Sequence, residues 1–146
     1  MTNILVIGDA GVGKTTLINN LIGKPFISQY LSTSQINLVE YNDYNFIDIP
    51  GQLKYSLDFS SINYDIVFIV YDLSNSISYS NLNFWIKKIY KPFIIIGNKS
   101  DCTLSVKLTN LIRSTSKQFD NLKLSCKNKI SIKELLSNYL NKKLII

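Results

Sequence analysis

Short apolar runs alternate with amphipathic stretches along this chain. The segments 3–7, 66–71 and 93–96 are almost continuously apolar. Runs of this length and composition are typical of parallel strands buried on both faces. The pattern therefore predicts three central strands of a parallel sheet.

Further strands are predicted beside them. The segments 35–41 and 44–49 are joined across Asn42 and Asp43, which suits a hairpin turn. One strand should therefore run antiparallel at an edge. The alternation in 122–124 indicates a short strand at the other edge.

Helical periodicity appears between the strands. The first helix should begin at Lys14, with Gly23 as a left-handed cap. Apolar positions from Leu82 to Ile89 predict another helix, 105–116 a third, and the capping-box pattern at Ser131 a last one. Segments 24–34 and 52–64 have no clear period, so we expect loops there, the second with at most a short helix. The fold class is α/β, with a mostly parallel six-stranded sheet, one antiparallel edge strand and helices on both faces.

Composition adds limits to this picture. With 146 residues and 46% hydrophobic content, we expect one domain over 1–146. No apolar run approaches the roughly twenty residues of a membrane span, and no targeting extension is evident before the first strand. Cys102 and Cys126 are expected to be free thiols in a reducing compartment. The net charge of +6 favours phosphate-bearing partners, but scattered lysines with Arg113 as the only arginine do not predict nucleic-acid binding.

The strongest chemical signal is Gly8-Asp9-Ala10-Gly11-Val12-Gly13-Lys14-Thr15, which lies between the first strand and the first helix. It fits the phosphate-binding pattern G-x-x-x-x-G-K-[ST] in the required context. Backbone N–H groups of such a loop and the helix N-terminus point at an anion, and the lysine adds a charge. The alternative is an ordinary glycine-rich turn. Candidate phosphate-binding residues are Gly8, Ala10, Gly11, Val12, Gly13, Lys14, Thr15 and Thr16.

Three more motifs follow in order, each just past a predicted strand: Asp48-Ile49-Pro50-Gly51, Asn98-Lys99-Ser100-Asp101 and Ser125-Cys126-Lys127. With the phosphate loop they resemble the small GTPases of the Ras superfamily, over essentially the whole chain. The segment 64–74 and Trp85 look most like the Rab branch. The resemblance implies a P-loop NTPase fold of the small G-protein type and a role in vesicle traffic.

The resemblance also implies a binding site for GTP or GDP with Mg²⁺. Thr15, Thr33 and Asp48 would hold the metal, and Thr33 and Gly51 would contact the γ-phosphate, so that hydrolysis releases two switch loops. Thr33 is flanked by Ser32 and Ser34, which leaves that assignment open. The guanine would be bound by Phe26, Asn98, Lys99, Asp101, Ser125, Cys126 and Lys127. For Asn98 to Asp101 the alternative is a polar turn.

Catalysis is implied at Gln52, which would orient the attacking water, with Lys14 and Thr33. Hydrolysis should be slow, because no arginine finger is expected from this chain and an activating protein would supply one in trans. An effector and an exchange factor are the other expected partners of a monomer.

Some residues depart from the family pattern. Ala10 replaces a glycine or serine, Pro50 stiffens the turn, and Leu53 replaces an acidic residue. The sequence ends without prenylation cysteines, so we expect a cytoplasmic protein with at most peripheral membrane contact. Two alternatives remain: a nucleotide-binding module that hydrolyses poorly and sequesters regulators or effectors, and a small P-loop kinase.

Overall fold

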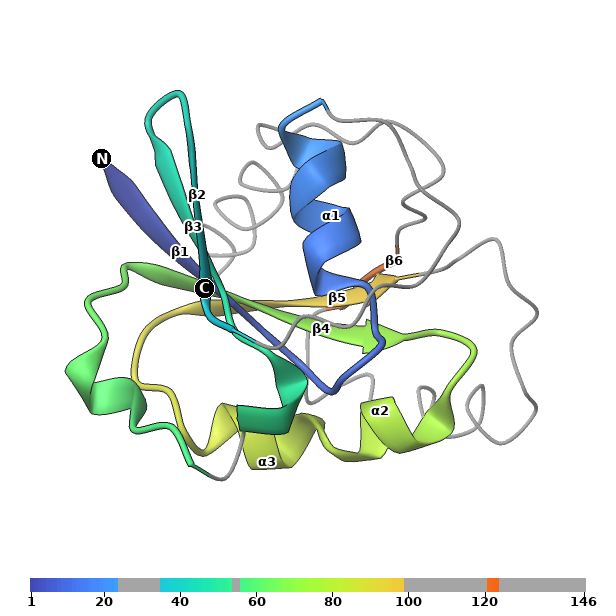
Figure 1. Ribbon diagram of the computed structural model, residues 1–146. Helices are drawn as coiled ribbons and strands as arrows, with labels where there is room; N and C mark the ends of the chain where they lie inside the picture. Colours follow the sequence, from blue (N-terminus) through green and yellow to red (C-terminus); the bar gives the residue numbers. More distant parts are fainter. Residues whose placement is uncertain (24–34, 54–55, 99–120, 124–146) are drawn as a thin grey trace, which may run out of the picture.

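The structure is a computed structural model, and it describes residues 1–23, 35–53, 56–98 and 121–123 (Figure 1). Six strands form one sheet in the order β2-β3-β1-β4-β5-β6. β2 is antiparallel to β3, and the other neighbours are parallel. This confirms the predicted sheet with an antiparallel edge strand. The strands are β1 (Thr2–Ile7), β2 (Asn37–Tyr41), β3 (Tyr44–Asp48), β4 (Ile66–Asp72), β5 (Phe93–Asn98) and β6 (Asn121–Lys123).

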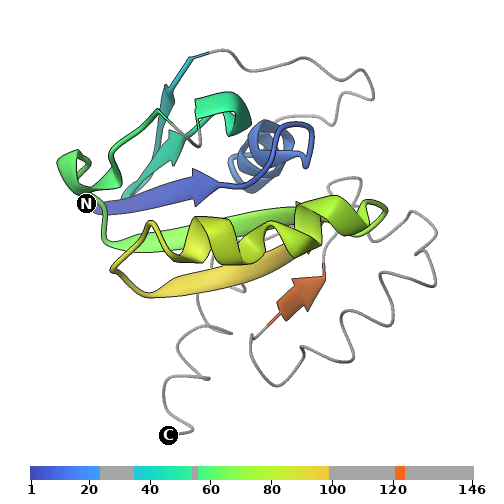
Figure 2. The same cartoon turned by 90° about the horizontal axis from the view of Figure 1, so that it is seen from below.

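Helices cover both faces of the sheet, as predicted (Figure 2). Alternate residues of β1 serve the two faces, because successive side chains of a strand point in opposite directions. Ile4 and Val6 join the hydrophobic layer under α1 (Lys14–Leu21). Leu5 and Ile7 join the layer that contains Leu82 and Trp85 of α3 (Leu82–Ile86). The second layer is completed near α2 (Ser76–Ser80) and the short 3₁₀ helices η1 (Gly51–Leu53) and η2 (Phe59–Ser61).

The helix predicted from Leu82 to Ile89 differs in the structure. It begins at Leu82 as α3 but ends at Ile86, and an additional short helix, α2, precedes it, with Asn81 as the cap residue between the two. Beyond Ile86 the chain tightens, because Ile89 N–H donates to Ile86 O over three residues. The turn leads into β5 through Pro92, which cannot continue a helix.

Other local predictions are confirmed. Gly23 ends the first helix with a φ of 83°. Asn42 begins the hairpin turn with a φ of 52°. The segment 52–64 is mostly loop in its described part, as predicted, but two short 3₁₀ helices occur where at most one was expected, since η1 reaches into the segment from Gly51 and η2 lies within it. The helices predicted over 105–116 and from Ser131, and Arg113, lie outside the described residues.

Parallel strands bring their carboxyl ends to one rim of the sheet. β1 lies between β3 and β4, where the strand order reverses, and ligands bind at the carboxyl ends of the strands at such a point in folds of this kind. Gly8 follows β1, Asp48 ends β3 and Asn98 ends β5. The fold therefore assembles residues distant in sequence at one rim.

Candidate functional site

A glycine-rich loop joins β1 to α1. Gly8, Gly11 and Gly13 have φ values of 150°, 80° and 94°, a region that favours glycine. A side chain at Gly8 would place its Cβ 2.2 Å from the carbonyl oxygen of Val70, so this position has no room for one. Positive φ at Gly11 and Gly13, two residues apart, turns backbone N–H groups inward and forms an anion-binding concavity. The loop is therefore shaped for an anion.

The N-terminus of α1 adds to that field. Its cap residue is Gly13, which has no side chain that could cap the helix, and the first turn contains no acidic residue. The backbone amides and the helix dipole at a helix N-terminus attract negative charge. Val12 contributes through its backbone, since its side chain is buried in the layer under α1.

Lys14 is the main cation at this site. Its side chain is only 6% exposed, and its Nζ donates to the carbonyl oxygens of Gly8 and Asp9, both at 2.9 Å. Burial lowers the pKa of Lys14 to about 8, while the charges of Asp48 and Asp9 act in the opposite direction. A phosphate in the loop would give this buried ammonium a charged partner, so the site favours an anion over the empty state.

Thr15 and Asp48 form a second part of the site. Thr15 Oγ1 donates to Asp48 Oδ2 at 2.5 Å, and Asp48 is 1% exposed. The other carboxylate oxygen, Asp48 Oδ1, is buried and accepts no hydrogen bond. Burial raises the pKa of Asp48, whereas the Thr15 hydroxyl and the Lys14 charge act to lower it.

The oxygen atoms of this pair suit a hard cation. Mg²⁺ prefers oxygen ligands and commonly takes only one or two carboxylates, with phosphates and waters completing its shell. Among the described residues no group of three His, Cys, Asp or Glu side chains could hold a metal. The unpartnered Asp48 Oδ1 is therefore the feature that fits Mg²⁺ or its water, in the presence of a phosphate.

Gly51 lies directly against the phosphate loop. A Cβ at Gly51 would fall 2.2 Å from Ala10 N and 2.6 Å from the carbonyl carbon of Asp9. Only a glycine allows the two backbones to come this close. The structure thus brings Gly51 beside the loop, followed by Gln52, whose side chain is exposed.

Asn98 links β5 to the same loop. It is 1% exposed, and its Nδ2 donates to Val12 O at 3.0 Å and to Gly13 O at 3.5 Å. Asn98, the first residue of its motif, is thereby held against the anion site. Thr16 follows on α1 and is partly exposed, whereas Ala10 is exposed on the loop.

The remaining predicted site residues cannot be compared with the structure. Their roles at the base and the metal stay predictions. Phe26, Thr33, Lys99, Asp101, Ser125, Cys126 and Lys127 lie outside the described residues.

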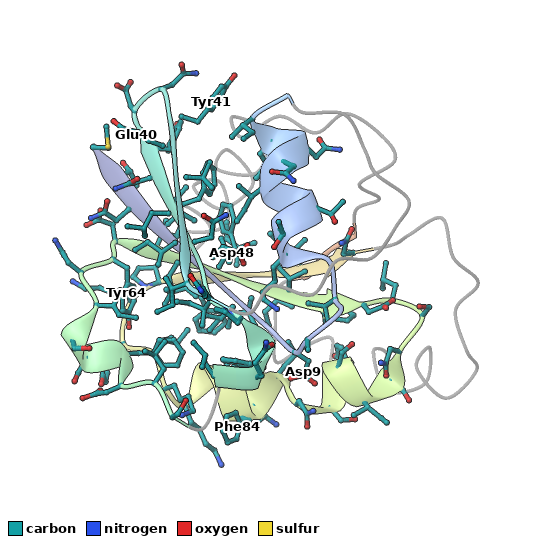
Figure 3. The ribbon with its side chains drawn as sticks, in the orientation of Figure 1. Asp9, Glu40, Tyr41, Asp48, Tyr64 and Phe84 are labelled. Atoms are coloured by element: carbon teal, nitrogen blue, oxygen red, sulfur yellow. The ribbon has the colours of Figure 1, made fainter. Side chains whose placement is uncertain are left out.

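One contact of the loop was not predicted from the sequence. The carboxylate of Asp9 accepts a hydrogen bond from Asn81 Nδ2 at 2.6 Å and another from Trp85 Nε1 at 3.0 Å. Asp9 lies on the loop near α2 and α3 (Figure 3). The negative charge of Asp9 was the feature of the sequence that could have predicted this contact. A carboxylate in an anion-binding loop is expected to turn away from the anion and toward other hydrogen-bond donors.

In the described part of the chain, we find no helix with the length and apolar character that crossing a membrane requires.

Comparisons with known proteins agree with this geometry. The model of the Ras family matches residues 3–144. Ras-related protein Rab-32D of Dictyostelium discoideum is 31% identical over 156 residues, covering 90% of this chain and 68% of that protein. Ras-related protein Rab7 of Pisum sativum is 31% identical over 121 residues, covering 69% of this chain and 59% of that protein. RABG3f of Arabidopsis thaliana matches to the same extent.

Proposed function

The chain belongs to the Ras family of small GTPases, in its Rab branch, and on that premise we propose that it is a guanine-nucleotide switch. It binds GTP or GDP with Mg²⁺ and hydrolyses GTP slowly to GDP and phosphate. The observation that carries the proposal is the buried Lys14 inside a glycine loop, with the Thr15–Asp48 pair beside it.

The phosphates bind to the loop and to Lys14. On binding, the ammonium exchanges its bonds to the carbonyls of Gly8 and Asp9 for the β- and γ-phosphate oxygens. The Gly51 N–H, close to the loop, detects the γ-phosphate. Loss of that phosphate removes this contact and the one proposed at Thr33, which releases both loops and changes the affinity for effectors.

Thr15, Asp48 and Thr33 hold the magnesium ion. When bound, Mg²⁺ neutralises charge that develops on the β- and γ-phosphate oxygens. Asp48 would offer its buried, unpartnered Oδ1 to the ion or its water, and the Thr15 hydroxyl, now bonded to Asp48 Oδ2, would become a ligand.

Gln52 orients the attacking water. Its exposed position next to Gly51 supports access of both water and a regulator to this point. An activating protein supplies an arginine, which accelerates such reactions by about 10³- to 10⁵-fold. Asp101 selects guanine through the base's N1–H and amine, with Asn98, Phe26, Lys99, Ser125, Cys126 and Lys127 around the ring.

The proposed protein is a single-domain monomer in the cytoplasm that acts in vesicle traffic. Its partners are an effector, an exchange factor and the activating protein. Nucleic acid is not among them.

Identification of the bound nucleotide tests the proposal directly. The purified protein is denatured and the released nucleotide is identified by chromatography, and GTP and ATP are then compared in exchange. We expect GDP or GTP, with ATP weaker by about 10⁴-fold or more, because a carboxylate facing adenine would be left unpaired. Equal affinity for ATP and GTP would remove the guanine assignment.

Replacement of Gln52 tests hydrolysis. We expect Gln52→Leu to slow single-turnover GTP hydrolysis roughly 10- to 100-fold, since the water loses its orientation. Gln35→Leu, at an exposed glutamine outside the proposed site, is the matched control and should hydrolyse at the wild-type rate. An unchanged, very low rate in all three proteins would instead favour the poorly hydrolysing interaction module.

A further inference from the structure

Asp9 is the point where the phosphate loop is tied to the helices on the other face of the sheet. Its two carboxylate oxygens accept hydrogen bonds from Asn81 and Trp85, which lie 72 and 76 residues further along the chain. Asn81 is the residue between α2 and α3, and Trp85 lies on α3. The contact therefore joins the loop to the α2–α3 segment, 73–89.

One donor of this contact, Trp85, is held in place by its surroundings. Trp85 is fully buried, and its ring meets Phe59 and Phe84 edge-on. A buried indole N–H that loses its acceptor carries a desolvation cost, so Trp85 holds the carboxylate of Asp9 strongly.

The backbone of Asp9 touches the chemistry of the site on two sides. Its carbonyl oxygen accepts from Lys14 Nζ at 2.9 Å. Its carbonyl carbon lies 2.6 Å from the position of a Cβ on Gly51. A shift of Asp9 would therefore move the lysine and close the space into which Gly51 fits.

Electrostatics alone would argue against an acidic residue here. A negative charge in a loop for polyphosphate repels the ligand, although it also favours the charged form of Lys14. The benefit that outweighs this repulsion is positional. The two hydrogen-bond donors keep the carboxylate directed away from the anion.

We propose that Asp9 is a positioning residue whose carboxylate, held by Asn81 and Trp85, fixes the phosphate loop in its binding shape and couples the α2–α3 segment to nucleotide occupancy. This inference rests on the proposed function, because the ligand of the loop is the GDP or GTP proposed above.

Three substitutions separate position from charge. Asp9→Ala removes both hydrogen bonds and the negative charge. Asp9→Asn removes the charge but keeps an oxygen for Trp85, and Asn81 can turn its amide to match. Asn81→Ala removes one donor without changing the loop, and Asn83→Ala, at an exposed position on α3, is its matched control.

Dissociation of a fluorescent GDP analogue with Mg²⁺ is the first measurement. We expect Asp9→Ala to release it about 10- to 100-fold faster, as for the loss of hydrogen bonds to a charged group. Asp9→Asn should stay within about threefold of wild type, and Asn81→Ala should be faster than Asn83→Ala. A purely electrostatic role predicts slower release from both Asp9 variants, and that result would overturn the inference.

Trp85 gives a second signal that a merely structural role would not change. It is the only tryptophan of the chain, so the intrinsic emission reports on this contact. We expect the tryptophan emission to change on GDP binding in wild type and in Asp9→Asn. In Asp9→Ala, GDP binding should leave the emission unchanged.

The possible failures differ from one another. A wild-type protein that binds no guanine nucleotide overturns the proposed function. Tight binding by wild type, with unchanged release and unchanged emission response in Asp9→Ala, overturns the inference alone. Should Asp9→Ala fail to fold, equal release from Asn81→Ala and Asn83→Ala overturns it.

Discussion

The two carboxylate oxygens of Asp48 differ in their surroundings. Oδ2 accepts from Thr15, whereas Oδ1 is buried without a partner. Such an atom costs stability in the empty protein, and a ligand that needs it recovers that cost. Asp48 thus favours ligand binding at the expense of the stability of the empty protein.

Asp48→Asn should preserve or raise the stability of the empty protein and should weaken the binding of Mg²⁺ with nucleotide. Without nucleotide, we expect its free energy of unfolding to equal or exceed that of wild type, because the buried charge is gone. Its affinity for Mg²⁺ with GDP should fall about 10- to 100-fold, as for residues that orient a metal shell. Urea unfolding measures the stability, and Mg²⁺-dependent nucleotide release measures the affinity. Asp43→Asn, on the exposed hairpin, is the control for both measurements.

The raised pKa of Asp48 determines how the stability difference between wild type and Asp48→Asn changes with pH. Since the pKa of Asp48 is raised in the folded state, the native protein binds this proton more tightly than the unfolded chain. Wild type therefore recovers stability relative to Asp48→Asn as the pH falls through the raised pKa toward 3.8. A stability difference that widens on acidification would contradict this.

Tyr71 offers a residue-scale contrast away from the phosphates. Its hydroxyl is buried without a hydrogen-bond partner, and burial raises its pKa. We expect Tyr71→Phe to leave stability unchanged or to raise it by about 1 kcal/mol. Tyr64→Phe is the control, because the Tyr64 hydroxyl accepts from Tyr90 N–H at 3.4 Å and its removal should not stabilise. Urea denaturation of the two variants checks the difference.

At the scale of elements, the β2–β3 hairpin depends on one unusual backbone conformation. Among the residues that the structure describes, Asn42 is the non-glycine residue with positive φ, at 52°. The next residue, Asp43, accepts a hydrogen bond from Thr2 N–H at 2.8 Å, which ties the turn to β1. The turn therefore supports the central strand as well as the edge.

Asn42→Ala should lower the free energy of unfolding by about 1 kcal/mol, because alanine adopts this conformation poorly. Asn42→Gly should change it by less than about 0.5 kcal/mol. Chemical denaturation of both variants, beside Asp43→Ala, measures the effect. Equal losses in the two Asn42 variants would assign the cost to the side chain instead.

Local rules predicted most of these elements. Continuous apolar runs identified β1, β4 and β5, and the Asn42-Asp43 pair identified the hairpin. The start of α3 at Leu82 was predicted, but α2 was missed, since serine alternates with Ile77 and Tyr79 along Ser76–Ser80 and gives no helical period. The contacts of Asp9 were missed because its partners are distant in sequence and adjacent only in the fold.

At the scale of the whole molecule, a ligand at the rim stabilises every element that ends there. Lys14, Asp48 and Asn98 come from three elements, so binding opposes the separation of all of them. The phosphate half of this site was predicted from the sequence by a motif of fixed spacing. The base half stays a prediction, because Asp101 and its neighbours lie outside the described residues.

GDP with Mg²⁺ should therefore raise the stability of the whole domain. At a free concentration of 100 times the dissociation constant, the expected gain is about 2.7 kcal/mol. Thermal unfolding with GDP, with ADP at equal concentration, and with GDP plus EDTA measures it. ADP should give little gain and EDTA should reduce that of GDP; equal gains with ADP and GDP would contradict guanine selection.

The strand order has a consequence for synthesis on the ribosome. β1 emerges first, yet Thr2 pairs with Tyr44 and Ile4 pairs with Ile66. β1 is therefore synthesised before either of the strands that it pairs with, and such distant pairings are slow to form. We expect the phosphate loop to acquire its shape only after β4 has left the exit tunnel, so a growing chain cannot capture nucleotide early.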